Sequence, residues 1–203
     1  MIHEDQPVKT AGIKLEEAEK VVIMVHGRGA TAESILGLKD QLPDAAFLAP
    51  QAANRTWYPK SFLELREQNQ PHLDSALEKI GSLVEKVAST VGKKNVYLLG
   101  FSQGACLSSE YAARNPQQYG GVIVFSGGLI GQEIEEYNGN MDKTSVYLCC
   151  SENDPHIPRK RVDDTVDIFK GLNADVEKQI FKGSSHTVNQ TELEKASEII
   201  NQA

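Results

Sequence analysis

Cysteine is scarce in this sequence, and long apolar runs are absent. The three cysteines, Cys106, Cys149 and Cys150, are an odd number and show no C-x-x-C spacing, which argues against a disulfide framework or a cysteine metal site. Free buried thiols are typical of a reducing compartment, so we expect a cytoplasmic protein. No apolar run is long enough to span a bilayer, so we expect no stable membrane insertion.

Positive charge is also in short supply. The chain has 21 Lys and Arg against 28 Asp and Glu, which gives a formal net charge of −7. Nucleic acids and anionic membranes repel such a surface, so we expect neither as a partner. Residues 1–7 include acids and lack the apolar stretch of a secretory signal, so no leader peptide is expected.

Apolar runs of strand length alternate with helical patterns along the chain. Six runs are typical of strands, at residues 21–25, 45–50, 96–99, 122–125, 145–150 and 175–181. Strands that alternate with helices predict an α/β fold with a mostly parallel central sheet and helices on both faces. The last run alternates in polarity, which favours an edge, and a further edge strand near Val8 or Ile13 is an alternative for the polar N-terminal segment. The absence of linkers and repeats predicts a single domain over residues 1–203.

Residues 100–104, Gly-Phe-Ser-Gln-Gly, form a G-x-S-x-G motif between a predicted strand and a helical pattern. Strand, sharp turn and helix are the context of a nucleophile elbow, in which a strained turn exposes a serine hydroxyl at the end of a sheet. The motif by itself is weak, and a plain strand-to-helix turn is the alternative. Its context and the rest of the chain favour the elbow, with Ser102 as the nucleophile.

Two later loops supply the groups that a serine nucleophile needs. A serine hydroxyl attacks only when a base takes its proton, and an imidazole held by a carboxylate suits that task. Asp154 lies in the loop after residues 145–150, and His186 lies in the loop after residues 175–181. Serine, acid and histidine in this chain order are typical of α/β-hydrolases.

Other residues compete for both roles. Glu152 is the main alternative acid because it lies closer to the strand, whereas Asp163 and Asp164 fall inside a predicted helix. Asp154 is preferred because an Asp-Pro pair anchors a turn and holds a short side chain rigidly. The other histidines suit the base less well: two are expected at the surface, one precedes the serine and one lies too close to the acid (His3, His72, His26 and His156).

An acyl-transfer intermediate also needs hydrogen-bond donors for its oxyanion. The backbone N–H of Gln103 is one candidate, because it follows the serine at a helix N-terminus, where free N–H groups favour negative charge. The second donor is expected from the early loop at residues 26–30, His-Gly-Arg-Gly-Ala. This loop lacks the Lys-Ser/Thr of a P-loop, and the chain has no G-x-G-x-x-G, so no nucleotide site is expected.

Together these motifs resemble the phospholipase/carboxylesterase family of the α/β-hydrolases, which includes small bacterial carboxylesterases and acyl-protein thioesterases. The matching segments cover most of the chain: His-Gly-Arg-Gly at 26–29, Gly-Phe-Ser-Gln-Gly at 100–104, Asp-Pro-His-Ile-Pro at 154–158 and Gly-Ser-Ser-His at 183–186. The resemblance implies the triad Ser102, Asp154 and His186. It also implies oxyanion donors at the N–H groups of Arg28 and Gln103, with no metal and no cofactor.

The activity implied by the resemblance is that of a serine carboxylesterase acting on small to medium acyl esters, aromatic ones among them. A thioesterase or lysophospholipase with the same triad is the alternative, and a binding module without catalysis is the alternative from another class. Acyl-protein thioesterases usually have an apolar residue and Gly-Asp where this chain has Arg28-Gly29-Ala30. The Arg-Gly form is more similar to bacterial esterases associated with hydroquinone or aromatic-compound stress, which argues against protein depalmitoylation.

Aromatic residues gather in the segment after the second predicted strand. Trp57, Tyr58 and Phe62 are expected to line a substrate pocket, with packing beneath a helix as an equal alternative for Trp57. The apolar residues of this lid-like loop also allow a homodimer.

Two basic features have less specific interpretations. The side chain of Arg28 is expected either to meet an anionic substrate group or, somewhat more favoured, to pair with a nearby acid. The run Arg159-Lys160-Arg161 is expected to be a solvated helix end.

Overall fold

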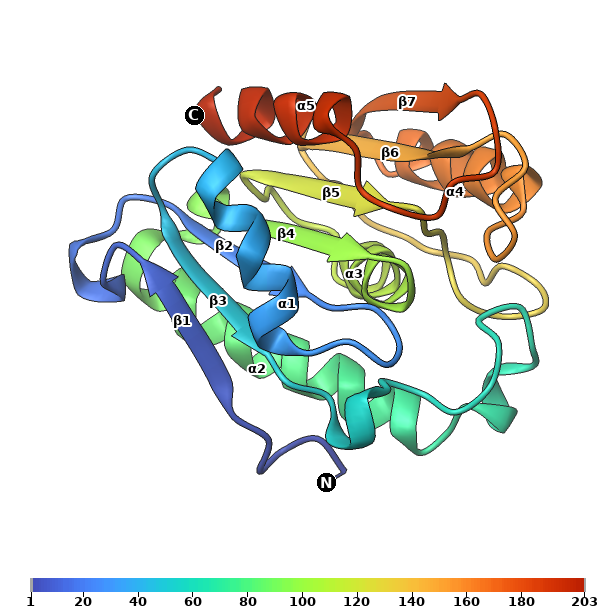
Figure 1. Ribbon diagram of the computed structural model, residues 1–203, viewed down its shortest axis with the longest axis horizontal. Helices are drawn as coiled ribbons and strands as arrows, with labels where there is room; N and C mark the ends of the chain where they lie inside the picture. Colours follow the sequence, from blue (N-terminus) through green and yellow to red (C-terminus); the bar gives the residue numbers. More distant parts are fainter. Residues whose placement is uncertain (1, 203) are drawn as a thin grey trace.

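The fold is built on one seven-stranded sheet, which a computed structural model describes together with the rest of residues 2–202 (Figure 1). The strand order is β1-β3-β2-β4-β5-β6-β7. β1 pairs antiparallel with β3, and every other neighbouring pair is parallel. The strands are β1 (Val8–Gly12), β2 (Val21–Val25), β3 (Ala46–Pro50), β4 (Val96–Phe101), β5 (Gly121–Phe125), β6 (Ser145–Ser151) and β7 (Asp175–Phe181).

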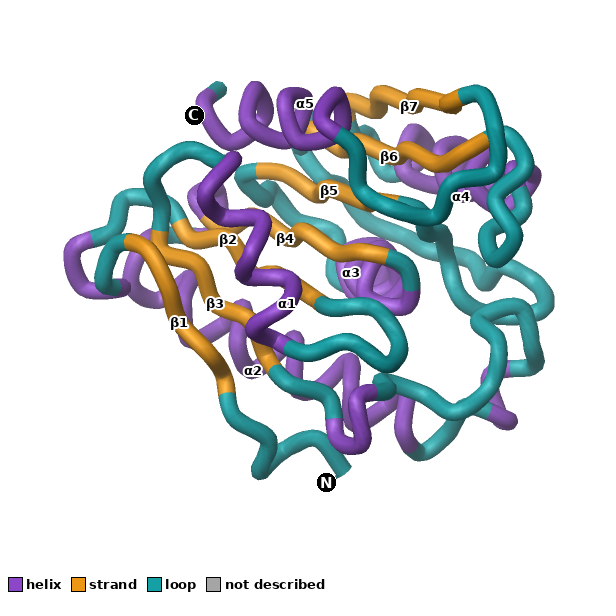
Figure 2. Tube along the Cα trace, in the orientation of Figure 1, coloured by secondary structure: helices purple, strands orange, loops and turns teal. Residues whose placement is uncertain are grey.

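Helices cover both faces of this sheet (Figure 2). The helices α1 and α5 pack on one face, and α2, α3 and α4 pack on the other. Their bounds are α1 (Ala32–Leu36), α2 (His72–Val91), α3 (Gln103–Arg114), α4 (Arg159–Gly171) and α5 (Gln190–Asn201); the short 3-10 turns are η1 (Leu15–Glu17), η2 (Gly37–Gln41), η3 (Ala53–Arg55), η4 (Arg66–Gln68) and η5 (Lys93–Asn95). This is the α/β-hydrolase architecture expected from the sequence.

The central strands are apolar along their whole length because both of their faces are buried. In β2, Val21, Ile23 and Val25 face the α2–α3 side, whereas Val22 and Met24 face the α1–α5 side, as the two-residue period of a strand requires. All five side chains are inaccessible to solvent. The uninterrupted apolar run in the sequence therefore corresponds to a central parallel strand.

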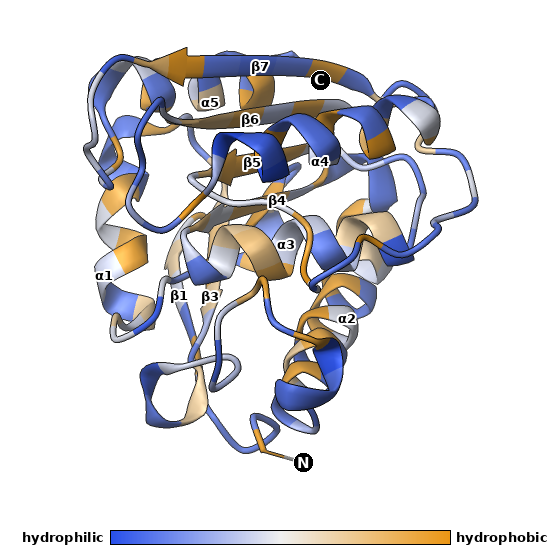
Figure 3. Cartoon of the chain, turned by 90° about the vertical axis from the view of Figure 1, so that its right-hand side faces the viewer, coloured by the Kyte–Doolittle hydropathy of each residue, from blue (hydrophilic) through white to orange (hydrophobic). Residues whose placement is uncertain are grey.

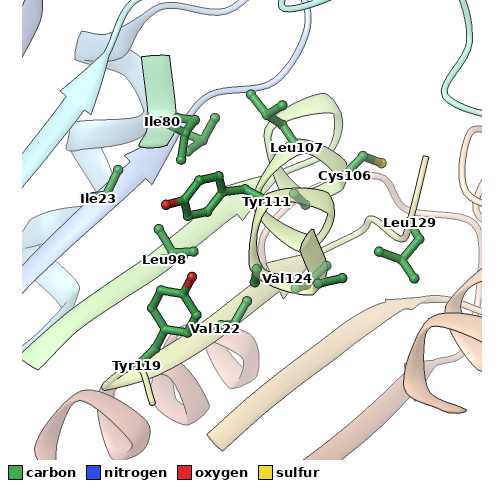
Figure 4. Close-up of a cluster of buried hydrophobic side chains, with 14 of the residues drawn as sticks. Ile23, Ile80, Leu98, Cys106, Leu107, Tyr111, Tyr119, Val122, Val124 and Leu129 are labelled. Carbon is green, nitrogen blue, oxygen red and sulfur yellow. The ribbon is translucent and has the colours of Figure 1, made fainter. Parts of the chain in front are cut away.

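The core between the sheet and α3 is continuous (Figure 4). Tyr111 of α3 points toward Ile23 of β2 and Leu98 of β4 there, and Leu107 of the same helix lies on the side of Ile80 of α2. On the outer side, α4 presents polar residues to solvent (Figure 3), while Val162, Val166 and other residues of its apolar stripe are buried against the sheet. The helical spacing of the apolar residues in the sequence predicts this separation into a buried apolar face and an exposed polar face.

The two edges of the sheet differ from its centre as the sequence predicts. β7 is an edge strand in which exposed and partly buried residues mix. The other edge is β1, which includes Val8 and ends before Ile13. Within residues 2–202, no helix combines the length and the apolar character that crossing a bilayer requires.

Loops from four parallel strands meet at one edge of the sheet. β2, β4, β6 and β7 all have their carboxyl ends on the right-hand side of Figure 1. In open parallel sheets, ligands bind beyond this edge. The topology thus brings together the four loops that carry the predicted functional residues.

The packing of α3 against β2 yields a test of the fold. A methyl group at Gly104 would overlap the carbonyl oxygen of Val25 and lie 2.6 Å from that of His26. Both obstacles are backbone atoms, which cannot move without separating α3 from the sheet. We therefore expect Gly104→Ala to lower the free energy of unfolding by about 3 kcal/mol or more, measured by urea denaturation.

The matched control for this substitution is Gly37→Ala. Gly37 ends α1 with helical dihedral angles, and a methyl group there would have no neighbour within 4 Å. We expect this variant to stay within about 0.5 kcal/mol of the parent. Equal urea midpoints for the two variants would contradict the packing argument.

Candidate active site

Ser102 lies in a strained turn between β4 and α3. Its φ is 55° and its ψ is −119°, a region that residues other than glycine rarely adopt. Two backbone hydrogen bonds hold the turn: the N–H of Ser102 donates to Phe125 (2.9 Å), and its carbonyl accepts from Cys106 (3.0 Å). An ordinary strand-to-helix turn needs no such strain, so the geometry favours the elbow.

The structure brings three predicted residues into one hydrogen-bonded chain. The Nε2 atom of His186 lies 2.8 Å from the Oγ atom of Ser102, and its Nδ1 atom lies 2.8 Å from Oδ2 of Asp154. Both contacts are satisfied when Nδ1–H donates to the carboxylate and Nε2 accepts from the hydroxyl. In that tautomer the imidazole is placed to take the hydroxyl proton.

Asp154 is built to keep its negative charge. Burial works to raise the pKa of this carboxyl, but hydrogen bonds from His186 and from the backbone N–H groups of His156 and Ile157 hold it below its usual range. These N–H groups lie 2.9 and 3.0 Å from Oδ1. The ionised carboxylate is thus fixed by the turn that Pro155 begins.

The alternative acids lie elsewhere. Glu152 is exposed. Asp163 pairs with Arg159 and Lys178, and Asp164 pairs with Lys160. Their places in or beside α4 agree with the sequence interpretation of surface charges.

Two other histidines are buried and have structural contacts. Nδ1 of His26 lies 2.8 Å from the Gly27 carbonyl, and Nε2 accepts the N–H of Ala52 (3.1 Å). The expectation of a surface position for His3 is wrong: its side chain is inaccessible, and Nε2 lies 3.0 Å from the Trp57 carbonyl. Burial lowers the pKa of both imidazoles, which favours their neutral forms.

His156 is the residue that sequence reasoning undervalued. Its exposed ring lies edge-on to that of His186, with 4.8 Å between centroids, and it lines the same pocket as Ser102. The sequence argued against His156 as the base because it lies only two residues from Asp154. The same short separation places its ring beside His186. His72, also expected at the surface, is partly buried at the start of α2.

The two expected oxyanion donors have free backbone N–H groups. Within residues 2–202, neither Arg28 nor Gln103 has an acceptor for its backbone N–H. By contrast, the N–H of Gly29, the residue after Arg28, donates to the Arg55 carbonyl (2.7 Å). The N–H of Gln103 opens α3, where the helix dipole adds positive potential. Both donors belong to residues that line the pocket containing Ser102, so an oxyanion formed there has donors available.

A pocket of about 500 Å³ contains Ser102 and His186 in its lining. Tyr58 and Phe62 contribute aromatic walls, as expected. Trp57 does not, because its side chain is fully buried and its Nε1–H donates to the carbonyl of His26 (2.9 Å). The expectation that Trp57 lines the pocket is therefore wrong. The alternative, that Trp57 packs in the core, is correct.

The side chain of Arg28 does not form the ion pair expected of it, and its contact with an anionic substrate group stays a prediction. Its guanidinium donates to the carbonyls of Pro59 (2.9 Å) and Lys60 (2.6 Å), and no acid pairs with it among the described residues. It also lies 5.9 Å from the centre of the Tyr58 ring. These contacts hold the segment that forms one wall of the pocket.

Arg161 lies against Phe62 of the pocket wall, and its expected place at a solvated helix end is wrong. Only 8% of this residue is exposed. Its guanidinium donates to the carbonyls of Leu129 and Gly131 (both 2.7 Å) and lies over the Phe62 ring. Loop carbonyls without a strand partner satisfy the buried charge.

The described residues 2–202 contain no metal-binding cluster. Within the described residues, no three His, Cys, Asp or Glu side chains come together as a metal site requires. The expectation of a reaction without metal or cofactor stays a prediction.

Comparison with known proteins agrees with the geometry. The model of the family described as Phospholipase/Carboxylesterase matches residues 12–203. The chain belongs to the phospholipase/carboxylesterase family. It is accordingly a serine hydrolase of the carboxylesterase, phospholipase and thioesterase type.

Three similar proteins illustrate the family. The crystal structure of a phospholipase/carboxylesterase from Dyadobacter fermentans DSM 18053 is 40% identical, with a TM-score of 0.94 and 98% of each chain covered. Acyl-protein thioesterase 1 of Kluyveromyces lactis is 23% identical, over 94% of each sequence. A probable inactive carboxylesterase of Oryza sativa subsp. japonica is 22% identical, over 86% of this chain and 81% of its own length.

The charge state of Asp154 predicts the pH dependence of hydrolysis. Because its pKa lies below the usual range of a carboxyl, Asp154 stays ionised under mildly acidic conditions. With His186 as the expected base, a single protonation then removes activity. We expect log kcat/KM to fall on acidification with a slope of about one per pH unit. A slope of about two, or activity that stays flat to about pH 4, would contradict this arrangement.

Proposed function

We propose that this protein is a carboxylesterase that hydrolyses small to medium acyl esters, aromatic ones among them, through an acyl-enzyme on Ser102. The observation that carries the proposal is the chain Asp154–His186–Ser102, with 2.8 Å at each contact, opening on a pocket with aromatic walls. Each member of the chain then has a distinct role in two successive steps.

In the first step, Oγ of Ser102 attacks the ester carbonyl carbon while Nε2 of His186 takes the hydroxyl proton. The N–H groups of Arg28 and Gln103 hold the oxyanion of the tetrahedral intermediate. Asp154 stabilises the imidazolium that forms. Collapse of the intermediate breaks the ester C–O bond, and His186 gives its proton to the departing alkoxide.

In the second step, water replaces the alcohol in the pocket. His186 takes a proton from this water as its oxygen attacks the acyl carbonyl, and the same two N–H groups hold the second oxyanion. Collapse breaks the bond to Oγ, which recovers the proton from His186. The products are the acid, the alcohol and the unchanged enzyme.

A thioesterase or lysophospholipase is the second candidate, because the same groups can cleave a thioester. The similarity to the acyl-protein thioesterase of K. lactis supports it. Acyl-protein thioesterases usually carry an apolar residue in the loop that follows β2. Arg28 occupies that place here, so we favour esters.

A cytoplasmic location is part of this proposal. Cys106, Cys149 and Cys150 are buried free thiols, which suits a reducing compartment. Burial also raises the pKa of Cys106 to about 12, so it stays a protonated thiol beneath the pocket. The homodimer stays a prediction, for which the half-exposed Leu65 near the pocket segment offers an apolar contact.

The role of Ser102 can be tested directly. We expect Ser102→Ala to lower kcat for p-nitrophenyl butyrate by about 10⁴-fold or more and to abolish labelling by a fluorophosphonate probe. The matched control is Ser89→Ala on the exposed side of α2, which should retain both activity and labelling. An unlabelled parent protein would instead favour a binding module without catalysis.

The choice between esters and thioesters calls for a second measurement. We expect kcat/KM for oxygen esters of acids with two to eight carbons to exceed kcat/KM for thioesters of the same acids, after division by their spontaneous hydrolysis rates. Faster turnover of acyl-CoA or acyl-cysteine substrates would overturn the ester assignment and leave the triad intact.

A further inference from the structure

The pocket that contains Ser102 is lined by cationic and imidazole groups in a protein that is acidic overall. Arg28, Lys60 and His156 line it beside His186, and none of the described lining residues is Asp or Glu. The chain as a whole has 28 acids and 21 Lys and Arg. The nearest carboxylate of the catalytic chain, Asp154, lies behind His186, where it is held by three hydrogen-bond donors.

Arg28 brings a fixed positive charge to the lining of this pocket. Its two contacts with the carbonyls of Pro59 and Lys60 fix the guanidinium in place, and a guanidinium has five N–H donors. Carbonyl acceptors do not neutralise its charge. The backbone N–H of Arg28 is a proposed oxyanion donor. The positive charge at the end of its side chain therefore belongs to the same residue that would contact the ester carbonyl.

Lys60 and His156 are polar side chains on the rim of the pocket that have no internal partner. Both are exposed, and in the described part of the chain neither the ammonium nor the imidazole has a hydrogen bond or an ion pair. Cations elsewhere are commonly paired with acids, as Lys178 is with Asp163 and Lys195 with Glu177. Lys60 and His156 have no such partner in the described part of the chain, so they are available to a bound molecule.

We propose that the preferred substrates are esters that carry a carboxylate near the scissile bond, bound by Arg28 and Lys60. This inference rests on the proposed esterase function. The apolar walls at Tyr58, Phe62 and Ile157 take the hydrocarbon part of such a substrate. A guanidinium suits planar oxyanions, which it binds with two parallel hydrogen bonds, and charge complementarity raises both affinity and the rate of encounter.

Matched ester pairs test this proposal. One pair places the charge on the acid: mono-4-nitrophenyl adipate against its neutral methyl ester. The other places it on the alcohol: 4-(butanoyloxy)benzoate against its methyl ester. After division by spontaneous hydrolysis rates, we expect kcat/KM of the charged member to exceed that of the neutral member by about tenfold in at least one pair. The pair that responds shows which side of the ester bears the anion.

Variants and salt separate the pocket charge from the charge of the whole protein. We expect Lys60→Glu to lower the charged-to-neutral ratio of kcat/KM by about tenfold. Lys93→Glu makes the same change of net charge at the exposed turn before β4, at the opposite end of that strand from Ser102, and should leave the ratio unchanged. In the parent, a rise from about 20 to about 500 mM salt should shrink the ratio, because salt screens exposed charges.

The outcomes distinguish this inference from the function on which it rests. Hydrolysis of neutral esters with no preference for the charged members, or equal effects of Lys60→Glu and Lys93→Glu, would overturn the inference and leave the esterase intact. Failure to hydrolyse any ester, with no fluorophosphonate label on Ser102, would overturn both. A charged-substrate preference that Lys60→Glu removes and salt weakens would support it.

Discussion

The close approach of α3 to the ends of β2 and β4 is the constraint on which the site depends. It requires Gly104 against the backbone of β2, and Gly100 against the first turn of α3, because a methyl group at either position would overlap backbone atoms. This approach leaves Ser102 at a positive φ, with its hydroxyl toward His186. The strain, of order 1–3 kcal/mol for such a residue, is offset by backbone hydrogen bonds to β5 and within α3.

The pocket wall depends on polar side chains because its segments lack regular strand partners. Gln103, directly after the serine, accepts the N–H of Trp57 (2.9 Å) and donates to the Tyr58 carbonyl (2.8 Å). The buried Glu110 of α3 pairs with Arg66 and accepts the N–H of Ile130 (2.9 Å). Unpaired backbone groups that are buried need such partners. The helix that carries the elbow therefore also positions the walls around it.

The sequence predicts best what depends on local periodicity and chain order. The apolar run at residues 21–25 identifies a central strand, and the order of Ser102, Asp154 and His186 places them at one edge of a parallel sheet. It predicts poorly where the outcome depends on contacts between distant segments. Arg161 carries a charge at a helix start, yet loop carbonyls some thirty residues away bury it. Hydrophobicity of a single residue likewise cannot tell whether Trp57 packs below a pocket or lines it.

Net charge and pocket charge act over different distances, so an acidic protein can bind anions. At physiological salt, exposed charges separated by more than about 8 Å are largely screened, and the acids on the outer helices contribute little at Ser102. Arg28 and Lys60 line the pocket itself, so they lie close to a small ligand bound there. The formal charge of −7 bears on encounters with large polyanions, which meet the whole surface. A small anionic ester contacts mainly the groups within the pocket. The charge of those groups is positive, whereas the net charge of the protein is negative.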